Sequence, residues 1–387
     1  MKRINENFYI DATRYNISTG VLKLKALILA GGVGTRLRPL SCTRPKLLFP
    51  IANKPLLDWT LERLAKSKVK EIILAVNYMA EVFIQHYGTA KYGMKLLYSR
   101  EGRPLRTGGP IKKAEKLIGH DEPFLVLNGD ILTNMNYTDL VKRHKENDAV
   151  ATIALYRVEN PSRYGIAEMT EKNRILRFLE KPARMEAPSN LANAGIYVLN
   201  PEIFDYIPCK CPVSIEYETF PKLAKKRKLL GYSFEGLWTD IGELGDYLKA
   251  NRLWLDTEIL KSKIEKSGRT KNNVEITTPT ILGKGVAIGE KSKIGPYVSI
   301  GDNVTIGKGV CIENSIVFPE TIVSDFASIK GAIIGENAII EKRVKIGDEC
   351  IIGDHAMIKD NVTLTKGVTV CPSKEVEESV LTPKSLM

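Results

Sequence analysis

Two periods of apolar residues divide the chain. In the N-terminal two thirds, residues 21–30, 71–77 and 123–128 are short apolar-rich segments of the kind that forms buried strands. Between them, residues 54–66 and 79–87 show the spacing of amphipathic helices. Strands that alternate with amphipathic helices predict an α/β domain whose sheet is largely parallel and covered on both faces.

The C-terminal third has a period of six. Glycine follows each of the first five repeated residues, as expected at the corners of a β-helix with three short flat sides. The repeated aliphatic positions are Leu282, Ile288, Ile294, Ile300, Ile306 and Ile312, then Ile334, Ile340, Ile346, Ile352, Ile358, Leu364 and Val370. A strict six-residue period predicts a left-handed parallel β-helix with these side chains inside. The interval from Ile312 to Ile334 is two residues short of a multiple of six, which predicts one shortened turn.

These patterns predict five regions along the 387 residues. They are an N-terminal extension at 1–20, an α/β domain at 21–250, a charged linker at 251–273, the β-helix at 274–372 and a C-terminal tail at 373–387.

The net charge of +12 leaves nucleic acid, an anionic membrane or phosphorylated small molecules open as partners. Residues 275–387 carry 12 Lys and Arg against 15 Asp and Glu, so the basic excess lies wholly in the N-terminal part. A lysine-rich surface alone would also give such an excess.

The sequence has no apolar run of about 18 residues, so no membrane span is expected. The polar residues 1–20 lack the apolar core of a secretory signal. The six cysteines are far apart in the sequence, except for the Cys-Lys-Cys at 209–211. This pattern indicates reduced thiols and a cytoplasmic protein. They are Cys42, Cys209, Cys211, Cys311, Cys350 and Cys371.

The candidate chemistry lies at the carboxyl ends of predicted strands, where ligands bind in such sheets. Residues 31–34 (Gly-Gly-Val-Gly) would let backbone N–H groups approach phosphate oxygens, and Arg36 and Lys46 would add positive charge. This glycine string does not end in Gly-Lys-Ser/Thr, as the Walker phosphate-binding loop does, and it lacks the spaced glycines of the Rossmann dinucleotide-binding motif. Asp130 follows another strand, where an aspartate can bind a metal or simply cap a turn.

The complete string from Leu29 to Lys46 resembles the signature of the sugar-1-phosphate nucleotidyltransferases, most closely that of the mannose-1-phosphate guanylyltransferases. The resemblance covers nearly all of residues 22–370. Further supporting segments are Asn53-Lys54-Pro55, Tyr164-Gly165, Glu180-Lys181-Pro182, the Asn-Ala-Gly-Ile-Tyr at 193–197, Ser214-Ile215-Glu216, Phe220-Pro221 and the Trp-Thr-Asp-Ile-Gly at 238–242.

This resemblance implies a Rossmann-like, mixed and mostly parallel sheet, the nucleotide-diphospho-sugar transferase fold, followed by the β-helix. It implies an enzyme that transfers a nucleotidyl group from an NTP to a sugar 1-phosphate and releases pyrophosphate, with GTP and mannose 1-phosphate giving GDP-mannose. UTP or dTTP with glucose 1-phosphate is the near alternative. A non-catalytic regulatory or exchange-factor-like subunit is another, but the presence of Arg36, Lys46, Asp130 and Asp240 favours the enzyme.

The resemblance also implies roles for individual residues. Asp130 and Asp240 match the ligands of a Mg²⁺ cofactor, and two hard carboxylates suit that ion. Arg36, Lys46 and Lys181 match catalytic positions. The sugar-phosphate positions are Gly165, Glu180, Lys181 and Asn193. The nucleotide positions are Leu29, Ala30, Gly31, Gly32, Gly34, Thr35, Arg106, Thr107 and Gly108.

Some of these residues have other interpretations. Glu180 and Lys181 could form a surface ion pair before a proline turn, and Asn193 could close a local turn. Arg106 stands where the family usually has glycine, so it could stack on the base or occupy its space. His355 could be an acyltransferase base, but an outward corner position is favoured.

The expected partners are an NTP and a sugar 1-phosphate, with no nucleic acid and no membrane. Because the tail carries no second catalytic motif, we expect the β-helix to cap the enzyme, to bind a regulator or to form a homo-oligomer.

Overall fold

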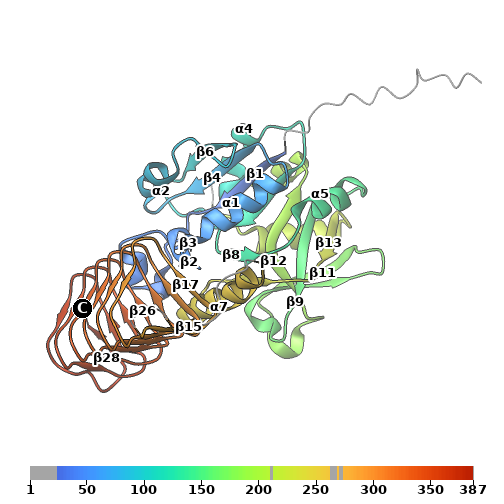
Figure 1. The fold of residues 1–387 in the computed structure, drawn as a ribbon. Helices are drawn as coiled ribbons and strands as arrows, with labels where there is room; N and C mark the ends of the chain where they lie inside the picture. Colours follow the sequence, from blue (N-terminus) through green and yellow to red (C-terminus); the bar gives the residue numbers. More distant parts are fainter. Residues whose placement is uncertain (1–23, 210–211, 262–267, 270–272, 387) are drawn as a thin grey trace, which may run out of the picture.

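The computed structural model describes residues 24–209, 212–261, 268–269 and 273–386. The predicted extension at residues 1–20 lies outside these residues, as does Cys211. An α/β domain and a prism-shaped stack of short strands lie side by side (Figure 1).

A mixed sheet forms the centre of the α/β domain. Its parallel part runs in the order β7 (Phe124–Asn128), β1 (Lys25–Leu29), β4 (Glu71–Val76) and β6 (Met94–Arg100). Antiparallel pairs extend it on both sides, and β9 and β13 form a further parallel pair. The other strands are β5 (Ala90–Lys91), β9 (Ala151–Arg157), β10 (Gly165–Met169), β11 (Ile175–Glu180), β12 (Leu191–Leu199) and β13 (Leu229–Ser233). The predicted mixed sheet is confirmed.

Helices cover both faces of this sheet. Alternate residues of β1 separate the two cores, because Leu27 packs with one cluster and Ile28 with the other. The Leu27 side is covered by α3 (Gly108–Lys113), α4 (Glu115–Ile118) and α6 (Phe220–Lys225). The Ile28 side is covered by α1 (Leu56–Lys66), α2 (Ala80–Tyr87) and α5 (Tyr137–Lys145). The strands are therefore apolar on both faces, as the sequence pattern predicts.

A short antiparallel pair outside the main sheet joins two distant segments. It consists of β8 (Ile131–Thr133) and β14 (Trp238–Asp240), with Asp240 opposite Ile131. The N–H of Ile241 donates to the carbonyl oxygen of Asp130 at 3.0 Å. This pairing makes Asp130 and Asp240 neighbours, although 110 residues separate them in the sequence.

The C-terminal stack has three sheets of short strands, which are parallel except for the β15–β16 pair. The interface sheet contains β17 (Thr280–Leu282), β20 (Val298–Ile300), β23 (Ile316–Val317), β26 (Ile333–Ile334), β29 (Ile351–Ile352), β32 (Thr369–Val370) and β34 (Ser385–Leu386). The outer sheet contains β18 (Ala287–Ile288), β21 (Thr305–Ile306), β24 (Ile322–Val323), β27 (Ile339–Ile340), β30 (Met357–Ile358) and β33 (Glu375–Val376). The polar sheet contains β15 (Gly268–Arg269), β16 (Glu275–Ile276), β19 (Lys293–Ile294), β22 (Cys311–Glu313), β25 (Ser328–Lys330), β28 (Lys345–Ile346) and β31 (Thr363–Leu364).

The predicted left-handed β-helix is confirmed, and its hexad residues from Ile294 onward line a buried core. Leu282, at the N-terminal end of the stack, is 38% exposed. The shortening of the repeat is placed differently from the prediction. Successive inward-facing residues are five positions apart, and not six, between Ile312 and Val317 and between Ile329 and Ile334. Two corners are therefore each one residue shorter. Both corners lead into the interface sheet. The strands β33 and β34 continue the stack beyond residue 372.

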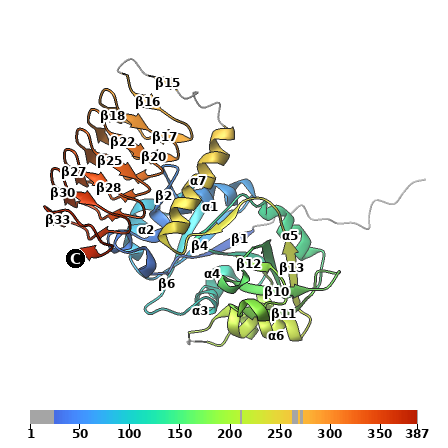
Figure 2. The same ribbon diagram turned by 90° about the horizontal axis from the view of Figure 1, so that it is seen from below.

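Helix α7 (Leu244–Lys261) lies between the two domains (Figure 2). The predicted boundary between the α/β domain and the linker, at residue 250, falls within this helix. Outward-facing Ile316, Ile333 and Ile351 of the interface sheet are almost fully buried against Phe49 and Tyr247 and their neighbours. The interface is therefore an apolar core shared by both domains. None of the described helices is long and apolar enough to cross a membrane.

Candidate active site

The glycine turn after β1 opens one wall of a cavity. Gly34 has a φ of 66°, in the left-handed region that favours glycine. A Cβ on Gly31 would lie 3.2 Å from Oε1 of Glu101, so this turn passes close to that carboxylate. The Cβ position of Gly32 has nothing within 4 Å, so this part of the turn borders open space.

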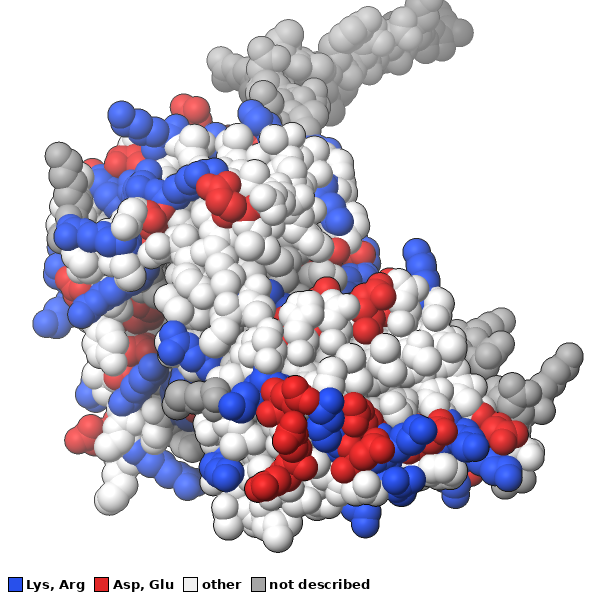
Figure 3. Space-filling model, turned by 90° about the vertical axis from the view of Figure 1, so that its left-hand side faces the viewer, with Lys and Arg blue, Asp and Glu red and all other residues white. Residues whose placement is uncertain are grey.

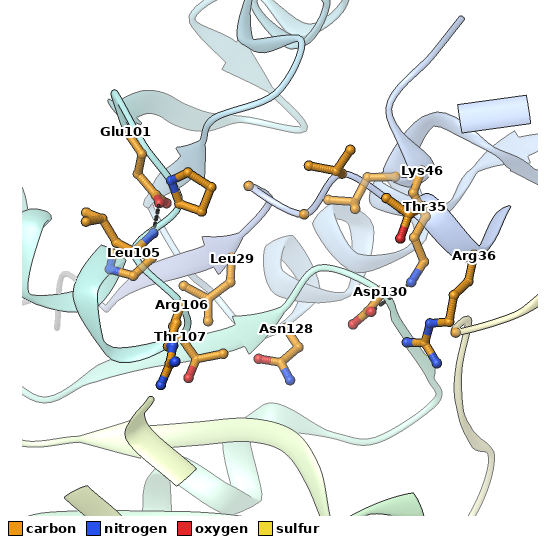
Figure 4. A pocket seen from close by; sticks show the side chains of 18 residues that line it. Leu29, Thr35, Arg36, Lys46, Glu101, Leu105, Arg106, Thr107, Asn128 and Asp130 are labelled. Atoms are coloured by element: carbon orange, nitrogen blue, oxygen red, sulfur yellow. Dashed lines mark hydrogen bonds and ion pairs between the residues drawn. The ribbon is translucent and has the colours of Figure 1, made fainter. Parts of the chain in front are cut away.

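The first cavity has a volume of about 430 Å³ and lies at the carboxyl ends of β1, β6 and β7 (Figure 4). Arg106 and Thr107 lie across it from Lys46 and Arg36. It is lined by Leu29, Gly31, Gly32, Val33, Gly34, Thr35, Arg36, Lys46, Leu47, Glu101, Pro104, Leu105, Arg106, Thr107, Pro110, Asn128, Asp130 and Gly242.

A second cavity, of about 330 Å³, adjoins the first and shares Arg36, Asn128 and Asp130 with it. Its lining is predominantly polar: Arg36, Asn128, Asp130, Ile131, Arg163, Tyr164, Gly165, Glu180, Lys181, Asn193, Gly195, Glu216, Trp238, Asp240 and Glu243. The structure thus brings most of the predicted site residues together in two connected spaces.

Lys46 connects the signature loop to the shared edge of the cavities. Its Nζ lies 2.8 Å from Oδ2 of Asp130, and the residue is only 9% exposed. Arg36 is exposed and lies 3.4 Å from Glu243, so its guanidinium remains accessible to an anionic ligand. The two basic groups stand at the same edge, one fixed and one open to solvent.

The carboxylates of Asp130 and Asp240 create a place that favours a cation. Burial raises the pKa of Asp240, a hydrogen bond from the Tyr164 hydroxyl at 2.9 Å opposes this shift, and the charge of Asp130 adds to it. Among the described residues, no group of three or more His, Cys, Asp and Glu side chains could hold a metal by itself. Two neighbouring carboxylates fit Mg²⁺, which commonly takes one or two carboxylates and completes its shell with phosphates and water.

Glu180 has a buried carboxylate oxygen that no donor among the described residues satisfies. Burial, with help from the charge of Glu216, raises the pKa of Glu180 to about 7 despite the opposing charge of Lys181. Its Oε2 is buried and accepts no hydrogen bond in the described structure. A buried acceptor of this kind is costly unless a ligand donates to it. Gly165 faces it across the β10–β11 pair.

Glu216 joins the walls of the two cavities. It is 8% exposed and accepts hydrogen bonds from the hydroxyls of Thr107 and, at 2.7 Å, Ser214. Thr107 lines the first cavity and Glu216 the second. This contact fixes the 105–108 loop relative to the second cavity.

Asn193 and Lys181 hold particular backbone positions beside the second cavity. Asn193 accepts from the N–H of Gly195 at 2.9 Å and donates to the Tyr197 hydroxyl at 3.0 Å. It thus closes a local turn and also lines the cavity. Lys181 is exposed, with a φ of 49° and its N–H bonded to the carbonyl of Tyr164 at 3.0 Å.

Three predicted nucleotide residues differ in their position relative to the first cavity. Arg106 has a φ of 60°, the conformation that a glycine would adopt without strain, and it lines the first cavity. Ala30 and Gly108 do not line it. Ala30 is 2% exposed within the core, and the N–H of Gly108 donates to the carbonyl of Val213 at 2.7 Å.

Residues 25–257 match the family described as nucleotidyl transferase, and residues 262–386 match the GMPPB C-terminal domain. The chain belongs to the nucleotidyl transferase family. The predicted family and the prediction of an enzyme are therefore confirmed.

Similar proteins include the mannose-1-phosphate guanyltransferase of Yarrowia lipolytica, which is 43% identical over 261 residues, 66% of this chain and 68% of the relative. The catalytic subunit beta of mannose-1-phosphate guanylyltransferase from Dictyostelium discoideum is 42% identical over 254 residues, 65% of this chain and 69% of the relative.

Solved structures of the same fold cover the α/β domain. A UDP-glucose pyrophosphorylase complexed with UDP-glucose has a TM-score of 0.55 at 26% identity and covers 60% of this chain and 99% of its own. HddC from Yersinia pseudotuberculosis, complexed with GMP-PN, has a TM-score of 0.51 at 29% identity with the same coverage.

The family motifs did not point to every cavity residue. Glu101 and Asn128 carry no family motif, yet both stand at the carboxyl ends of strands, β6 and β7. The strand-end argument that selected Asp130 would also have selected Asn128, but Glu101 follows a strand that the sequence pattern did not predict. Arg163 ends a short helix (Pro161–Arg163) before β10, and no motif or periodic signal marks it, whereas Tyr164 belongs to the Tyr164-Gly165 segment of the resemblance.

Proposed function

We propose that this nucleotidyltransferase uses GTP and mannose 1-phosphate and forms GDP-mannose and pyrophosphate. The names of the relatives support this pair of substrates. The observation that carries the proposal is the pair of cavities that share Arg36 and Asp130, with Lys46 at the same edge. One cavity would hold the nucleotide and the other the sugar phosphate.

The reaction needs alignment and charge compensation more than proton transfer. An oxygen of the sugar phosphate attacks the α-phosphorus of GTP, the bond from that phosphorus to the β-phosphate oxygen breaks, and pyrophosphate leaves with the electron pair. The attacking phosphate is already anionic, so no general base is required. Arg36, Lys46 and Lys181 would reduce the repulsion between the two polyanions.

Asp130 and Asp240 would hold Mg²⁺ together with the nucleotide phosphates. The ion would supply positive charge at the phosphates. Lys46 would keep the Asp130 carboxylate oriented through its 2.8 Å contact, and Tyr164 would do the same for Asp240.

Glu101 supports guanine as the base. It is 8% exposed, lines the first cavity and accepts at Oε2 from the N–H of Leu105 at 3.2 Å. Guanine alone among the common bases presents two neighbouring donors, N1–H and N2–H₂, on its pairing edge. A carboxylate can accept from both, whereas adenine and uracil each place an acceptor beside their donor.

The function is tested by measuring pyrophosphate release with each NTP and several sugar 1-phosphates in the presence of Mg²⁺. We expect GTP with mannose 1-phosphate to be the preferred pair. Release with UTP or dTTP but not with GTP would contradict the substrate assignment. A protein that folds but releases no pyrophosphate with any pair would contradict catalysis itself.

The metal role of Asp130 has its own test. We expect Asp130→Asn to lower kcat by about 100-fold or more and to raise the Mg²⁺ concentration that gives half the maximal rate. Asp121→Asn, at an exposed position away from both cavities, is the control. An unchanged Mg²⁺ dependence in Asp130→Asn would remove this residue from the metal site.

The role of Glu101 is tested by nucleotide preference. Glu101→Gln replaces one acceptor oxygen by a donor, so we expect kcat/KM for GTP to fall about 10-fold to 100-fold relative to that for UTP. The ratio is measured with both nucleotides at a fixed sugar phosphate concentration. An unchanged ratio would mean that other groups read the base.

A cytoplasmic location and a homo-oligomer formed through the β-helix remain proposals. The outer sheet supports the second of them, since its outward-facing Ile322 is 44% exposed and stacks in register with Ile339 and Met357. Analytical ultracentrifugation would measure the oligomer, and a monomer at all concentrations would contradict it.

A further inference from the structure

Two basic side chains of the signature loop, Arg38 and Arg44, line neither cavity. Arg44 is two residues from Lys46, but its Nη2 lies 2.6 Å from Oδ2 of Asp354 and 2.6 Å from Oε2 of Glu336. Its guanidinium also stands 4.9 Å from the ring centre of Phe318. All three partners belong to the β-helix, so this loop of the α/β domain is bound to the other domain.

The contact between Arg44 and Asp354 is buried, whereas the Glu336 side chain is 36% exposed. The side chain of Arg44 is 17% exposed and that of Asp354 is 3% exposed. Burial acts to lower the pKa of Arg44, but Asp354 and Glu336 outweigh it and raise this pKa above its ordinary value. The hydroxyl of Thr43 donates to the same Oδ2 of Asp354 at 2.6 Å. Removing one partner would leave a buried charge uncompensated.

Asp354 differs from other aspartates at the corners of the β-helix. Its Oδ1 accepts from the N–H of Glu336 at 2.8 Å, as Oδ1 of Asp360 accepts from the N–H of Lys342 at 2.8 Å. Asp360 is exposed, whereas Asp354 is 2% exposed because the loop covers it. Both residues stabilise a corner, but Asp354 also binds the loop.

A single residue separates Arg44 from Lys46, which stands at the shared edge of the cavities. Pro45 stands between Arg44 and Lys46 with a φ of −59°, which its ring holds fixed. The short helix at Lys46–Leu48 follows, with the N–H of Leu48 bonded to the carbonyl of Pro45 at 2.9 Å and that of Phe49 to Lys46 at 3.0 Å. A shift of Arg44 would therefore move the backbone of Lys46.

We propose that Arg44 is a positioning residue, through which Asp354 and Glu336 of the β-helix hold Lys46 against Asp130. The β-helix is then part of the machinery of the α/β domain, and not only a cap on it. The kinetic arm of the test rests on the proposed function. The structural arm does not, because it measures the loop itself.

The structural arm is amide hydrogen exchange over residues 34–49 in the full chain. Arg44→Met removes the charge and keeps most of the apolar stem. Asp354→Asn keeps the oxygen that caps Glu336 but weakens the bond to Arg44. We expect the amides of Leu48 and Phe49 to exchange at least about 10-fold faster in both variants. Asp360→Asn, which alters an equivalent corner away from the loop, should exchange like the wild type.

The kinetic arm separates positioning from binding. We expect kcat to fall about 10-fold to 100-fold in Arg44→Met and Asp354→Asn, with KM for both substrates changed by less than about threefold, because a small misplacement of Lys46 affects the reacting geometry. Arg44→Lys, which can still pair with one carboxylate, should recover part of the loss. Asp360→Asn should retain the wild-type kcat.

Thermal unfolding and circular dichroism establish whether each variant is folded. If Arg44→Met does not fold, the exchange rates and kcat of Asp354→Asn or Arg44→Lys test the proposal in its place. Wild-type exchange and kcat in folded Asp354→Asn would overturn the proposal, and so would an equal loss in Asp360→Asn. A wild-type protein without turnover would contradict the proposed function instead, and the exchange rates would still decide this inference.

Discussion

At the residue scale, the most informative side chain is Glu180. A carboxylate whose Oε2 is buried without a donor is unfavourable in the free protein, and its pKa of about 7 is the direct consequence. It lines the polar cavity next to Lys181. Both facts are consistent with a ligand that brings hydroxyl donors, as a hexose does.

The pKa of Glu180 leads to a prediction about pH. The ordinary pKa of a glutamate is about 4.3, so the shift keeps Glu180 protonated up to about pH 7 in the free enzyme. Only the ionised form accepts hydrogen bonds at both oxygens. We therefore expect kcat/KM for the sugar phosphate to rise with pH through about 7, by up to about 10-fold per unit below it.

Glu180→Gln provides the comparison. The ionisation of the sugar phosphate itself affects both proteins equally, so the difference between their pH profiles reports Glu180. We expect the variant to have a lower kcat/KM and a flatter profile between pH 6 and 8. Identical profiles would exclude Glu180 as the titrating group.

Several residue roles could be anticipated from the sequence, because the motifs place charged residues beside glycine turns and strand ends. Arg44 could not. The Arg-Pro-Lys string at 44–46 puts two cations together, and nothing in it shows that one binds the β-helix while the other faces Asp130. Their directions depend on which surfaces surround the loop.

At the scale of elements, the β10–β11 pair shapes the second cavity. Gly165 stands opposite Glu180 in the register of these strands. A Cβ on Gly165 would overlap Oε2 of Glu180 and would lie 2.6 Å from Cζ of Phe178. This glycine is therefore required by the close approach of two strands, and its φ is not in the left-handed region.

Gly165→Ala tests this packing. We expect the displaced Glu180 to raise KM for the sugar phosphate about 10-fold or more, while KM for the nucleotide changes little, because the first cavity does not contain this strand. Gly245→Ala is the matched control, since nothing lies within 4 Å of its Cβ position. Equal effects on both Michaelis constants would indicate a general loss of structure.

The sequence located the elements that it predicted within residues 21–128 because their periods are local, whereas β6 and the strands that follow β7 in the α/β domain were not predicted. The predicted segments 54–66 and 71–77 contain α1 (Leu56–Lys66) and β4 (Glu71–Val76). The sequence also showed that the six-residue repeat is two residues short between Ile312 and Ile334. It did not show that two corners of the β-helix each lose one of these residues. The inner residues Val317, Val323 and Ile329 lie off the six-residue register, so counting alone could not place the loss.

At the scale of the whole molecule, the two domains share a core. Figure 3 shows Lys and Arg side by side with Asp and Glu on the face that it presents, without a single continuous basic patch there. Beneath the surface, Leu37, Leu40 and Phe49 of the α/β domain pack with Ile333 and its neighbours on the interface sheet. Apolar burial and the Arg44 contact therefore join the domains together.

Ile333→Asp tests this shared core. Ile333 and Ile322 both point outward from the β-helix, but Ile333 is 0% exposed and Ile322 is 44% exposed. An unpaired carboxylate at Ile333 must separate the domains or remain buried at high cost. We expect calorimetry to show a lower first unfolding temperature and two transitions in place of one.

Ile322→Asp places the same charge on the outer sheet. At a protein concentration where ultracentrifugation shows a monomer, it should change the unfolding temperature by no more than a few degrees. If Ile333→Asp unfolds like Ile322→Asp, the two domains do not depend on each other for stability.

The sequence by itself determined the family, the two repeating patterns and most of the residues around the cavities, because glycine turns, strand periods and hexads are properties of neighbouring positions. The tertiary structure alone decided which of these residues meet. The β8–β14 pair brings Asp240 to Asp130, the two cavities share an edge, and Arg44 binds Asp354 more than 300 residues away. Such contacts follow from the packing of surfaces in three dimensions, and no spacing along the chain encodes them.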